Sequence, residues 1–321
     1  DQCNVLFASV DNKINLDQSE ETGEISKYDS ANAEHIAKVI DATCIDSKSI
    51  ASKQFKVVVD AVNGAGSTIL PKLCEDLGCH VTTINCNGDG NFTRVAEPLA
   101  ENLNNLEEKV LEVGADIGFA TDPDGDRLSI VSNKGDAIGE EYTLALSFKN
   151  FINYQDSMIV TNLSTSRMID DISSGSIRTK IGEAHVVEKM KELNILIGGE
   201  GNGGVILKEV HLGRDSLVAT AMILNLLSRD NKSLHEIIAE IPSYIFIKDK
   251  INIDNSIDFD SLATLFDCDE INTEDGIKFS WSDKWIHIRK SNTEPIIRIF
   301  AEAKTENEVN DLIQTLKDFL K

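Results

Sequence analysis

The sequence predicts an α/β fold: two α/β domains with mixed or parallel sheets, followed by a smaller α+β domain. Two stretches alternate short apolar runs with helical patterns, and after Pro242 closely spaced strand patterns precede one last helix. Alternating strands and helices predict right-handed crossovers and largely parallel sheets. A chain of 321 residues is long enough for two or three domains. We therefore place the domains at 28–139, 140–242 and 243–321, after a first segment 1–27.

The composition argues against two classes of function. A net charge of −23 opposes non-specific nucleic-acid binding, because phosphates would be repelled. The sequence contains no apolar run of about eighteen residues, so it predicts no membrane span. The six cysteines include no C-x-x-C pair, which favours reduced thiols in a cytoplasmic protein over disulfides or zinc ligands. An anionic substrate therefore has to be held by a local basic cluster.

The first segment, 1–27, contains one strand-like run at 4–10, then a polar turn and an acidic stretch. A lone run of this kind needs a partner strand, so we interpret the segment as the remnant of a preceding domain and a linker. A helix is predicted over 28–43, where apolar residues recur at helical spacing. On this helix we assign His35 a structural role.

The first α/β domain is predicted from alternating strand and helix patterns. The expected strands are 55–60, 81–84, 115–120 and 128–131, with helices at 68–77 and 102–113. The turn 63–67 is glycine-rich, follows a strand and precedes a helix, a geometry that suits an anion near backbone N–H groups. Gly64 and Gly66 equally fit a plain turn, and both interpretations stay open.

Three carboxylates alternate in the loop 121–127, at Asp122, Asp124 and Asp126, with Pro and Gly between them. Three converging anions repel one another unless a cation joins them, and oxygen ligands favour a hard divalent ion such as Mg²⁺. A solvated Asp-rich turn is the alternative. An EF-hand is excluded, because the Gly falls between the second and third acids and no Glu stands at the twelfth loop position.

The second α/β domain repeats the same alternation. The expected elements are a strand at 157–160, a helix opening at 165–167, a strand and turn at 177–182, a helix at 184–193, a strand at 195–197, and a helix that runs through 227 and is capped by Asp215. Five glycines in 198–204 bring the backbone close to a ligand, with Glu200 and Asn202 as the functional side chains. A carboxylate beside an amide suits sugar hydroxyls, and a flexible hairpin is the alternative.

The C-terminal domain is predicted to have strands at 244–250, 276–280, 285–289 and 296–301 and a helix at 306–320. The loop 289–298 sets two arginines around neutral donors, which is how proteins bind a phosphate dianion. The residues of this predicted phosphate site are Arg289, Ser291, Asn292, Thr293 and Arg298.

In this order, the motifs TDPDGDR, GGEGNGG and RKSNTEPIIR resemble those of the α-D-phosphohexomutase family, which includes phosphoglucomutase, phosphomannomutase and phosphoglucosamine mutase. The resemblance implies four domains around a cleft, each giving one loop, and a phosphoserine that exchanges phosphoryl groups with the sugar. By position it implies Mg²⁺ ligands at Asp122, Asp124 and Asp126, a catalytic Arg127, sugar contacts at Glu200 and Asn202, and a phosphate clamp at 289–298. As acid or base, Lys180, Glu183 and His185 are candidates; we retain Lys180 as catalytic, without assigning its role.

Two departures from the family pattern affect the interpretation. No Ser-His-Asn-Pro loop is present, so we expect the first domain to be absent and the chain to be inactive alone. Asn202 and Gly204 stand where many members have Ser and His, a form that resembles archaeal-type phosphoglucosamine mutases. The expected reaction interconverts a hexosamine or hexose 6-phosphate and 1-phosphate through a bisphosphate intermediate.

Alternatives remain open at this stage. The sequence also fits a phosphomannomutase or phosphoglucomutase, or a non-catalytic protein that binds sugar phosphates. A haloacid-type phosphatase shares the D-x-D pattern. In such an enzyme the first Asp is the nucleophile and follows an early strand, and neither a sugar loop nor a phosphate clamp is expected. The expected partner is a phosphorylated hexose or hexosamine, with no nucleic acid and no membrane, and a homodimer is left open.

Overall fold

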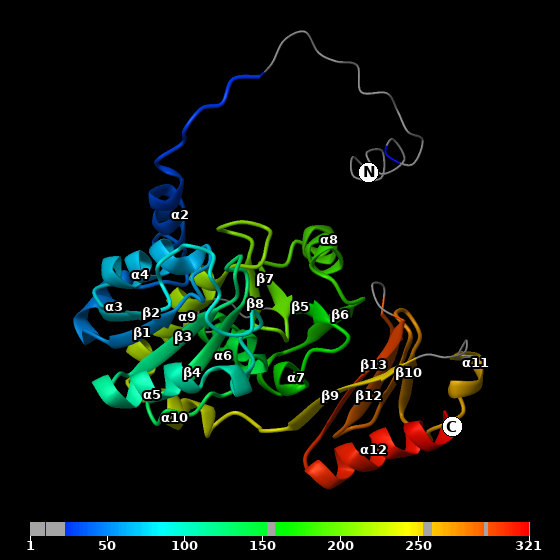
Figure 1. Ribbon diagram of the computed structural model, residues 1–321. Helices are drawn as coiled ribbons and strands as arrows, with labels where there is room; N and C mark the ends of the chain where they lie inside the picture. The colour runs from blue at the N-terminus through cyan, green and yellow to red at the C-terminus, as the bar shows by residue number, and fades with distance from the viewer. Residues whose placement is uncertain (1–9, 11–22, 153–157, 253–258, 292–294, 321) are drawn as a thin grey trace.

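The computed structural model describes residue 10 and residues 23–152, 158–252, 259–291 and 295–320. The strand predicted over 4–10 falls outside this description except for its last residue. Two α/β units lie against each other and a smaller sheet domain lies beside them (Figure 1). Within the described ranges, no helix has the length and apolar character that a membrane crossing requires.

The first unit is a mixed sheet in the order β2-β1-β3-β4. Strand β1 pairs in parallel with β2 and β3, whereas β4 runs antiparallel to β3. The loop 121–127 is therefore the turn of an antiparallel hairpin at the sheet edge. In chain order the elements are α2 (Ala31–Ile40), α3 (Ser47–Lys53), β1 (Lys56–Asp60), α4 (Gly66–Asp76), β2 (His80–Ile84), the short 3-10 helix η1 (Ala100–Asn102), α5 (Asn104–Val113), β3 (Ile117–Thr121) and β4 (Leu128–Ser132).

The second unit repeats this topology in the order β6-β5-β7-β8. Strand β5 pairs in parallel with β6 and β7, and β8 closes an antiparallel hairpin on β7 whose turn is the glycine-rich loop. Its elements are α6 (Glu141–Phe151), β5 (Ile159–Asn162), α7 (Met168–Ile172), β6 (Ser176–Thr179), α8 (Glu183–Leu193), β7 (Ile197–Glu200), β8 (Gly204–Leu207), α9 (Ser216–Asp230) and α10 (Leu234–Ile238).

The two units share one hydrophobic core, in which α6 and α9 pack against each other between the sheets. Most residues of both helices are buried, so neither helix shows a polar face. The sequence prediction missed α6 for this reason, because a helix buried all round has no amphipathic period. Helix α9 begins as predicted: the Asp215 carboxylate accepts hydrogen bonds from the backbone N–H groups of Leu217 and Val218.

The third unit is an antiparallel sheet in the order β10-β11-β12-β13-β9, with α12 packed on one face over a separate core. A capping box of Thr305 and Glu308 starts α12. Its elements are β9 (Ile245–Asn252), α11 (Phe259–Leu262), β10 (Glu270–Asn272), β11 (Ile277–Ser280), β12 (Trp285–Lys290), β13 (Ile296–Ala303) and α12 (Glu306–Phe319). The predicted fold class, two α/β domains and a C-terminal α+β domain, is confirmed.

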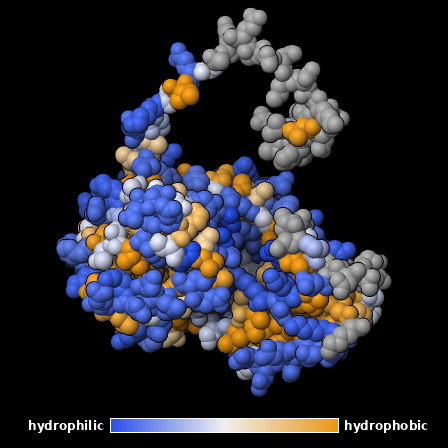
Figure 2. Space-filling model, viewed as in Figure 1, coloured by the Kyte–Doolittle hydropathy of each residue, from blue (hydrophilic) through white to orange (hydrophobic). Residues whose placement is uncertain are grey.

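Buried polar contacts attach the third unit to the second. The buried His287 Nδ1 lies 2.8 Å from the Ser164 hydroxyl, and Lys278 Nζ donates to the Leu163 carbonyl at 2.6 Å. Burial lowers the pKa of Lys278 to about 7 and that of His287 to about 4, so neither group needs to carry a full charge inside. In Figure 2 the visible face is mostly hydrophilic, and apolar residues gather over the third unit. The buried contacts of His287 and Lys278 hold the sheet of the third unit beside the end of β5.

Candidate active site

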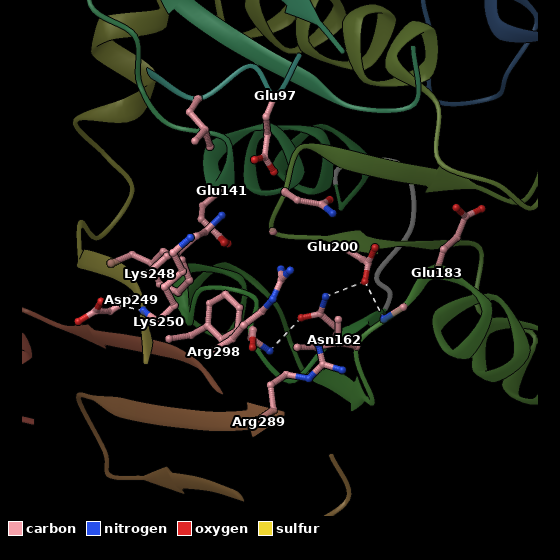
Figure 3. A pocket seen from close by; sticks show the side chains of 18 of the residues that line it. Glu97, Glu141, Asn162, Glu183, Glu200, Lys248, Asp249, Lys250, Arg289 and Arg298 are labelled. Atoms are coloured by element: carbon pink, nitrogen blue, oxygen red, sulfur yellow. Dashed lines mark hydrogen bonds between the residues drawn. The ribbon is translucent and has the colours of Figure 1, made fainter. Parts of the chain in front are cut away.

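A cavity of about 700 Å³ lies where the three units meet (Figure 3). Acidic groups line it on the side of the first two units, and most of its basic groups come from the third. The lining residues are Glu97 and Leu99 from the first unit, Glu141, Asn162, Ser164, Ile181, Gly182, Glu183, Glu200, Gly201, Asn202 and Arg214 from the second, and Phe246, Lys248, Asp249, Lys250, Arg289, Ile296, Arg298 and Phe300 from the third.

The acid loop, residues 121–127, is shaped by the glycine-rich turn 63–67. A Cβ on Gly64 would lie 2.3 Å from the Pro123 carbonyl oxygen, so only glycine permits this approach. The Ala65 N–H donates to the same oxygen at 2.7 Å. This turn therefore supports the acid loop, and the N–H group of Ala65 is already occupied by protein.

The acid loop brings its three carboxylates together. Oxygens of Asp122, Asp124 and Asp126 lie within 4.8 Å of one another. Burial and the charge of Asp122 raise the pKa of Asp126 to about 7. Burial also disfavours the charged form of Asp122, but the hydrogen bonds from Arg127 and Asp126 and the charge of Arg127 together outweigh it and lower the pKa of that carboxyl. The high pKa of the partly buried Asp126 carboxyl indicates that Asp122 and Asp124 crowd it with negative charge, and three clustered carboxylates fit a hard divalent cation such as Mg²⁺.

Arg127 is held at the end of the acid loop by two carboxylates. Its Nε donates to Asp122 Oδ2 at 2.6 Å and its guanidinium donates to Glu97 Oε1 at 2.8 Å. Glu97 lines the cavity and comes from the long loop before η1. Sequence reasoning did not select Glu97, because its loop contains no motif of its own.

The glycine-rich loop lies against Leu128, the first residue of β4, directly after the acid loop. The Gly203 carbonyl accepts a hydrogen bond from the Leu128 N–H at 3.0 Å, and a Cβ on Gly203 would lie 2.3 Å from the Leu128 carbonyl oxygen. The φ angle of Gly203 is +87°, which a side chain rarely adopts. The glycine-rich loop is therefore fixed to the backbone of β4 at the point where the acid loop ends.

Glu200 is buried and accepts hydrogen bonds from three protein groups. Its Oε1 accepts from the Asn162 side chain at 2.8 Å and from the Gly182 N–H at 3.0 Å, and its Oε2 accepts from Arg214 at 3.0 Å. Asn202 Oδ1 accepts from the N–H of Gly204 in the same loop, at 3.2 Å. Both residues line the cavity, so their remaining lone pairs and N–H groups are available to a ligand there.

Arg214 joins the acid loop to the glycine-rich loop. Its guanidinium contacts carboxylates from three elements, namely Asp126, Glu183 at 3.2 Å and Glu200 at 3.0 Å. Sequence reasoning noticed only its neighbour Asp215 as a helix cap. Its position directly before the predicted cap Asp215 was the signal available in the sequence.

The basic side of the cavity is a row of cations across three adjacent strands. Arg298 of β13 is directly opposite Arg289 of β12 on one side and Lys250 of β9 on the other. Like charges directly opposite each other destabilise a sheet, so a row of this kind in a chain of net charge −23 marks a place for an anion. Arg289 also contacts Asp275 at 3.3 Å. The sequence indicated both arginines, but not Lys250 or the nearby Lys248.

Of the remaining predicted site residues, those that the structure describes lie outside the cavity lining. The N–H of Ser291 donates to the Ile296 carbonyl at 2.9 Å, which closes the turn between β12 and β13. Asn292 and Thr293 lie outside the described residues. Lys180 is exposed just before two residues that line the cavity, and His185 is exposed on α8. A catalytic role for Lys180 therefore stays a prediction.

Three family models match the chain in succession. They are phosphoglucomutase/phosphomannomutase alpha/beta/alpha domain II over residues 33–135, alpha/beta/alpha domain III over 139–244, and the C-terminal domain over 250–318.

Curated relatives share this family. A phosphoglucomutase/phosphomannomutase of Thermococcus kodakarensis is 38% identical over 280 residues, which is 84% of this chain and 61% of that protein. A phosphoglucosamine/phosphogalactosamine mutase of Sulfurisphaera tokodaii is 30% identical over 316 residues, 94% of this chain and 69% of that protein. The chain thus spans 61% and 69% of the length of these two relatives.

Solved structures show the same fold. A phosphoglucomutase/phosphomannomutase family protein from Burkholderia thailandensis has a TM-score of 0.83 at 24% identity, and the match covers 100% of this chain and 69% of that one. N-acetylphosphoglucosamine mutase of Aspergillus fumigatus, in complex with GlcNAc-6P and magnesium, has a TM-score of 0.60 at 14% identity, and the match covers 94% of this chain and 68% of that one.

Proposed function

Because this chain belongs to the phosphoglucomutase/phosphomannomutase family, we propose that it forms the metal-, sugar- and phosphate-binding part of a phosphohexomutase. The proposed reaction interconverts a hexosamine 6-phosphate and 1-phosphate through a phosphoserine and a bisphosphate intermediate. These 321 residues contain no Ser-His-Asn-Pro loop. We therefore propose that the chain alone binds its substrate without turning it over.

The row of Lys250, Arg298 and Arg289 carries the proposal. Three adjacent cations line a cavity whose lining also includes the acidic and amide groups of the glycine-rich loop. A sugar phosphate has this polarity, with a dianion at one end and hydroxyl groups at the other. Guanidinium groups bind phosphate with two parallel hydrogen bonds, which also fixes its orientation.

The acid loop completes the proposed site. Asp122, Asp124 and Asp126 would hold Mg²⁺, which when bound neutralises charge on a phosphoryl group during its transfer. The glycine-rich loop would orient the sugar, with Glu200 fixed in place by three protein donors. Arg214 would keep the two loops in register, because one guanidinium contacts a carboxylate of each. The cation row would meanwhile hold the phosphate that is not transferred.

Two observations support an amino sugar as the substrate. The first two units contribute the carboxylates of Glu97, Glu183 and Glu200 to the cavity lining, and their negative charge suits the ammonium group of glucosamine. The relative from Sulfurisphaera tokodaii is a phosphoglucosamine/phosphogalactosamine mutase. The relative from Thermococcus kodakarensis is a phosphoglucomutase/phosphomannomutase, so glucose and mannose phosphates are the competing substrates to compare.

Calorimetric titration of the chain with glucosamine 6-phosphate, glucose 6-phosphate and mannose 6-phosphate tests the proposal. We expect the tightest binding for glucosamine 6-phosphate, and a loss of roughly 10- to 100-fold in the Arg298→Gln variant. Glucosamine without phosphate should bind far more weakly. Phosphorus NMR on the same samples should show no conversion of 6-phosphate to 1-phosphate.

Each part of the proposal has its own contradicting result. Equal binding of glucosamine with and without phosphate would rule out the cation row as a phosphate site. Tighter binding of glucose or mannose 6-phosphate would move the substrate assignment to those sugars. Turnover by the chain alone would show that its own residues supply the phosphoryl carrier.

A further inference from the structure

A second cluster of potential metal ligands lies outside the cavity lining. His35 of α2 and His211, from the turn before α9, both point Nε2 at Asp215 Oδ2, at distances of 2.7 Å and 3.0 Å. The sequence assigned His35 a structural role on an amphipathic helix. In the structure its ring is partly exposed and lies 5.5 Å, centre to centre, from the ring of His211.

The two oxygens of the Asp215 carboxylate have different partners, which explains why both imidazoles point to the same atom. Its Oδ1 accepts from the Leu217 N–H at 2.7 Å and caps α9, so Oδ2 is left for both imidazoles. Two ring nitrogens therefore share one acceptor oxygen. With its proton on Nδ1 instead, each imidazole would direct an Nε2 lone pair to the same point.

We propose that His35, His211 and Asp215 form a second divalent-cation site, for a zinc-like ion that prefers imidazole ligands. The three ligand atoms lie within 4.8 Å of one another. With metal–ligand bonds of about 2.0–2.2 Å, ligand atoms in a tetrahedral site are roughly 3.3 Å apart, so small side-chain movements would complete the geometry. The exposed fractions of the His35 and His211 side chains, 28% and 41%, leave a fourth position open to water.

Ligand chemistry separates this site from the acid loop. Two imidazoles and one carboxylate favour zinc, cobalt, nickel or copper, whereas the three carboxylates of the acid loop favour magnesium. The two sites should therefore take different ions in the presence of both. The proposal does not rest on the assigned sugar-phosphate chemistry.

An ion at this site would link α2 to the first turn of α9. His35 is on α2, and Asp215 caps α9 and follows Arg214 directly in the chain. The site therefore connects the first unit to the residue that joins the acid and glycine-rich loops. We expect a bound ion to raise the thermal unfolding temperature of the chain.

Cobalt titration of the chain, purified without a histidine tag and kept in excess magnesium, tests the proposal. Four-coordinate cobalt with nitrogen ligands absorbs visible light intensely, whereas cobalt surrounded by six oxygens absorbs weakly. We expect one equivalent of cobalt to develop the intense band and zinc to displace it. His35→Gln and His211→Gln should each weaken cobalt binding by at least about tenfold.

His80→Gln is the matched control, because His80 is an exposed histidine on β2, away from the cluster. This variant should bind cobalt as the parent chain does. The proposal is overturned if the parent shows only the weak spectrum, or if the intense band survives unchanged in both cluster variants. Equal loss of the band in His80→Gln would also overturn it. Circular dichroism of the variants verifies that each is folded.

Discussion

Replacing Lys250 by Met should strengthen the fold while weakening ligand binding. Lys250 is exposed to the cavity and directly opposite Arg298 in the sheet. A like-charged cross-strand pair costs about 0.2–1 kcal/mol, and the substitution removes one such pair. The same ammonium would form a charge-assisted hydrogen bond with phosphate, worth about 1.5–3 kcal/mol. Affinity should therefore fall roughly 10- to 150-fold.

Thermal unfolding and calorimetric titration with glucosamine 6-phosphate measure the two effects on one sample. The gain in stability should shrink at high salt, because repulsion between exposed charges is screened. Lys48→Met, which changes an exposed lysine on α3 outside the cavity lining, should alter neither quantity noticeably. Lower stability of Lys250→Met with unchanged phosphate affinity would refute the interpretation of the row as an anion site.

Three further predictions concern the loops. Burial and a neighbouring carboxylate raise the pKa of Asp126 to about 7, so Mg²⁺ affinity should fall as the pH drops below about 7. Asp124→Asn should weaken Mg²⁺ binding at every pH, and Mg²⁺ titration measures both effects. In the absence of metal, the stability of the fold should depend on pH in the opposite direction. The pKa of Asp126 in the folded state exceeds that of an unfolded Asp, so stability should decrease as the pH rises through about 7. Arg214→Met leaves three carboxylates without their shared cation and should lower the free energy of unfolding by about 2–4 kcal/mol. The loss is smaller than for a fully buried pair because 18% of the Arg214 side chain is exposed. An unchanged unfolding temperature would contradict this prediction. Gly64→Ala places a Cβ 2.3 Å from a backbone oxygen of the acid loop and should cost about 1–3 kcal/mol and weaken Mg²⁺ binding, whereas Gly23→Ala, with nothing within 4 Å, should change neither.

The sequence predicted the fold wherever a local pattern determines the structure. The apolar run at β1 forms a buried strand, and the amphipathic period of α12 buries one face of that helix. Both elements lie where they were expected. Helix α6 escaped prediction because it is buried on nearly all sides by the core that the first two units share. Its position depends on tertiary packing, which no short window of the sequence contains.

The candidate site shows the same division between local and distant information. Loops with their own composition, such as the acid loop and the turn between β12 and β13, were recognised from the sequence alone. Arg214 and Lys250 were not, because each acquires a role only through partners far away in the chain. Arg214 reaches Asp126 across 88 residues, and Lys250 lies beside Arg298 only after the sheet has formed.

A structure of the chain determined with glucosamine 6-phosphate tests the central claim most directly. We expect the phosphate to lie among Lys250, Arg289 and Arg298, with the sugar hydroxyls toward Glu200 and Asn202. The same complex prepared with Lys250→Met should show the phosphate weakened or absent. A phosphate bound away from the cation row, or a sugar that does not face the glycine-rich loop, would contradict the account.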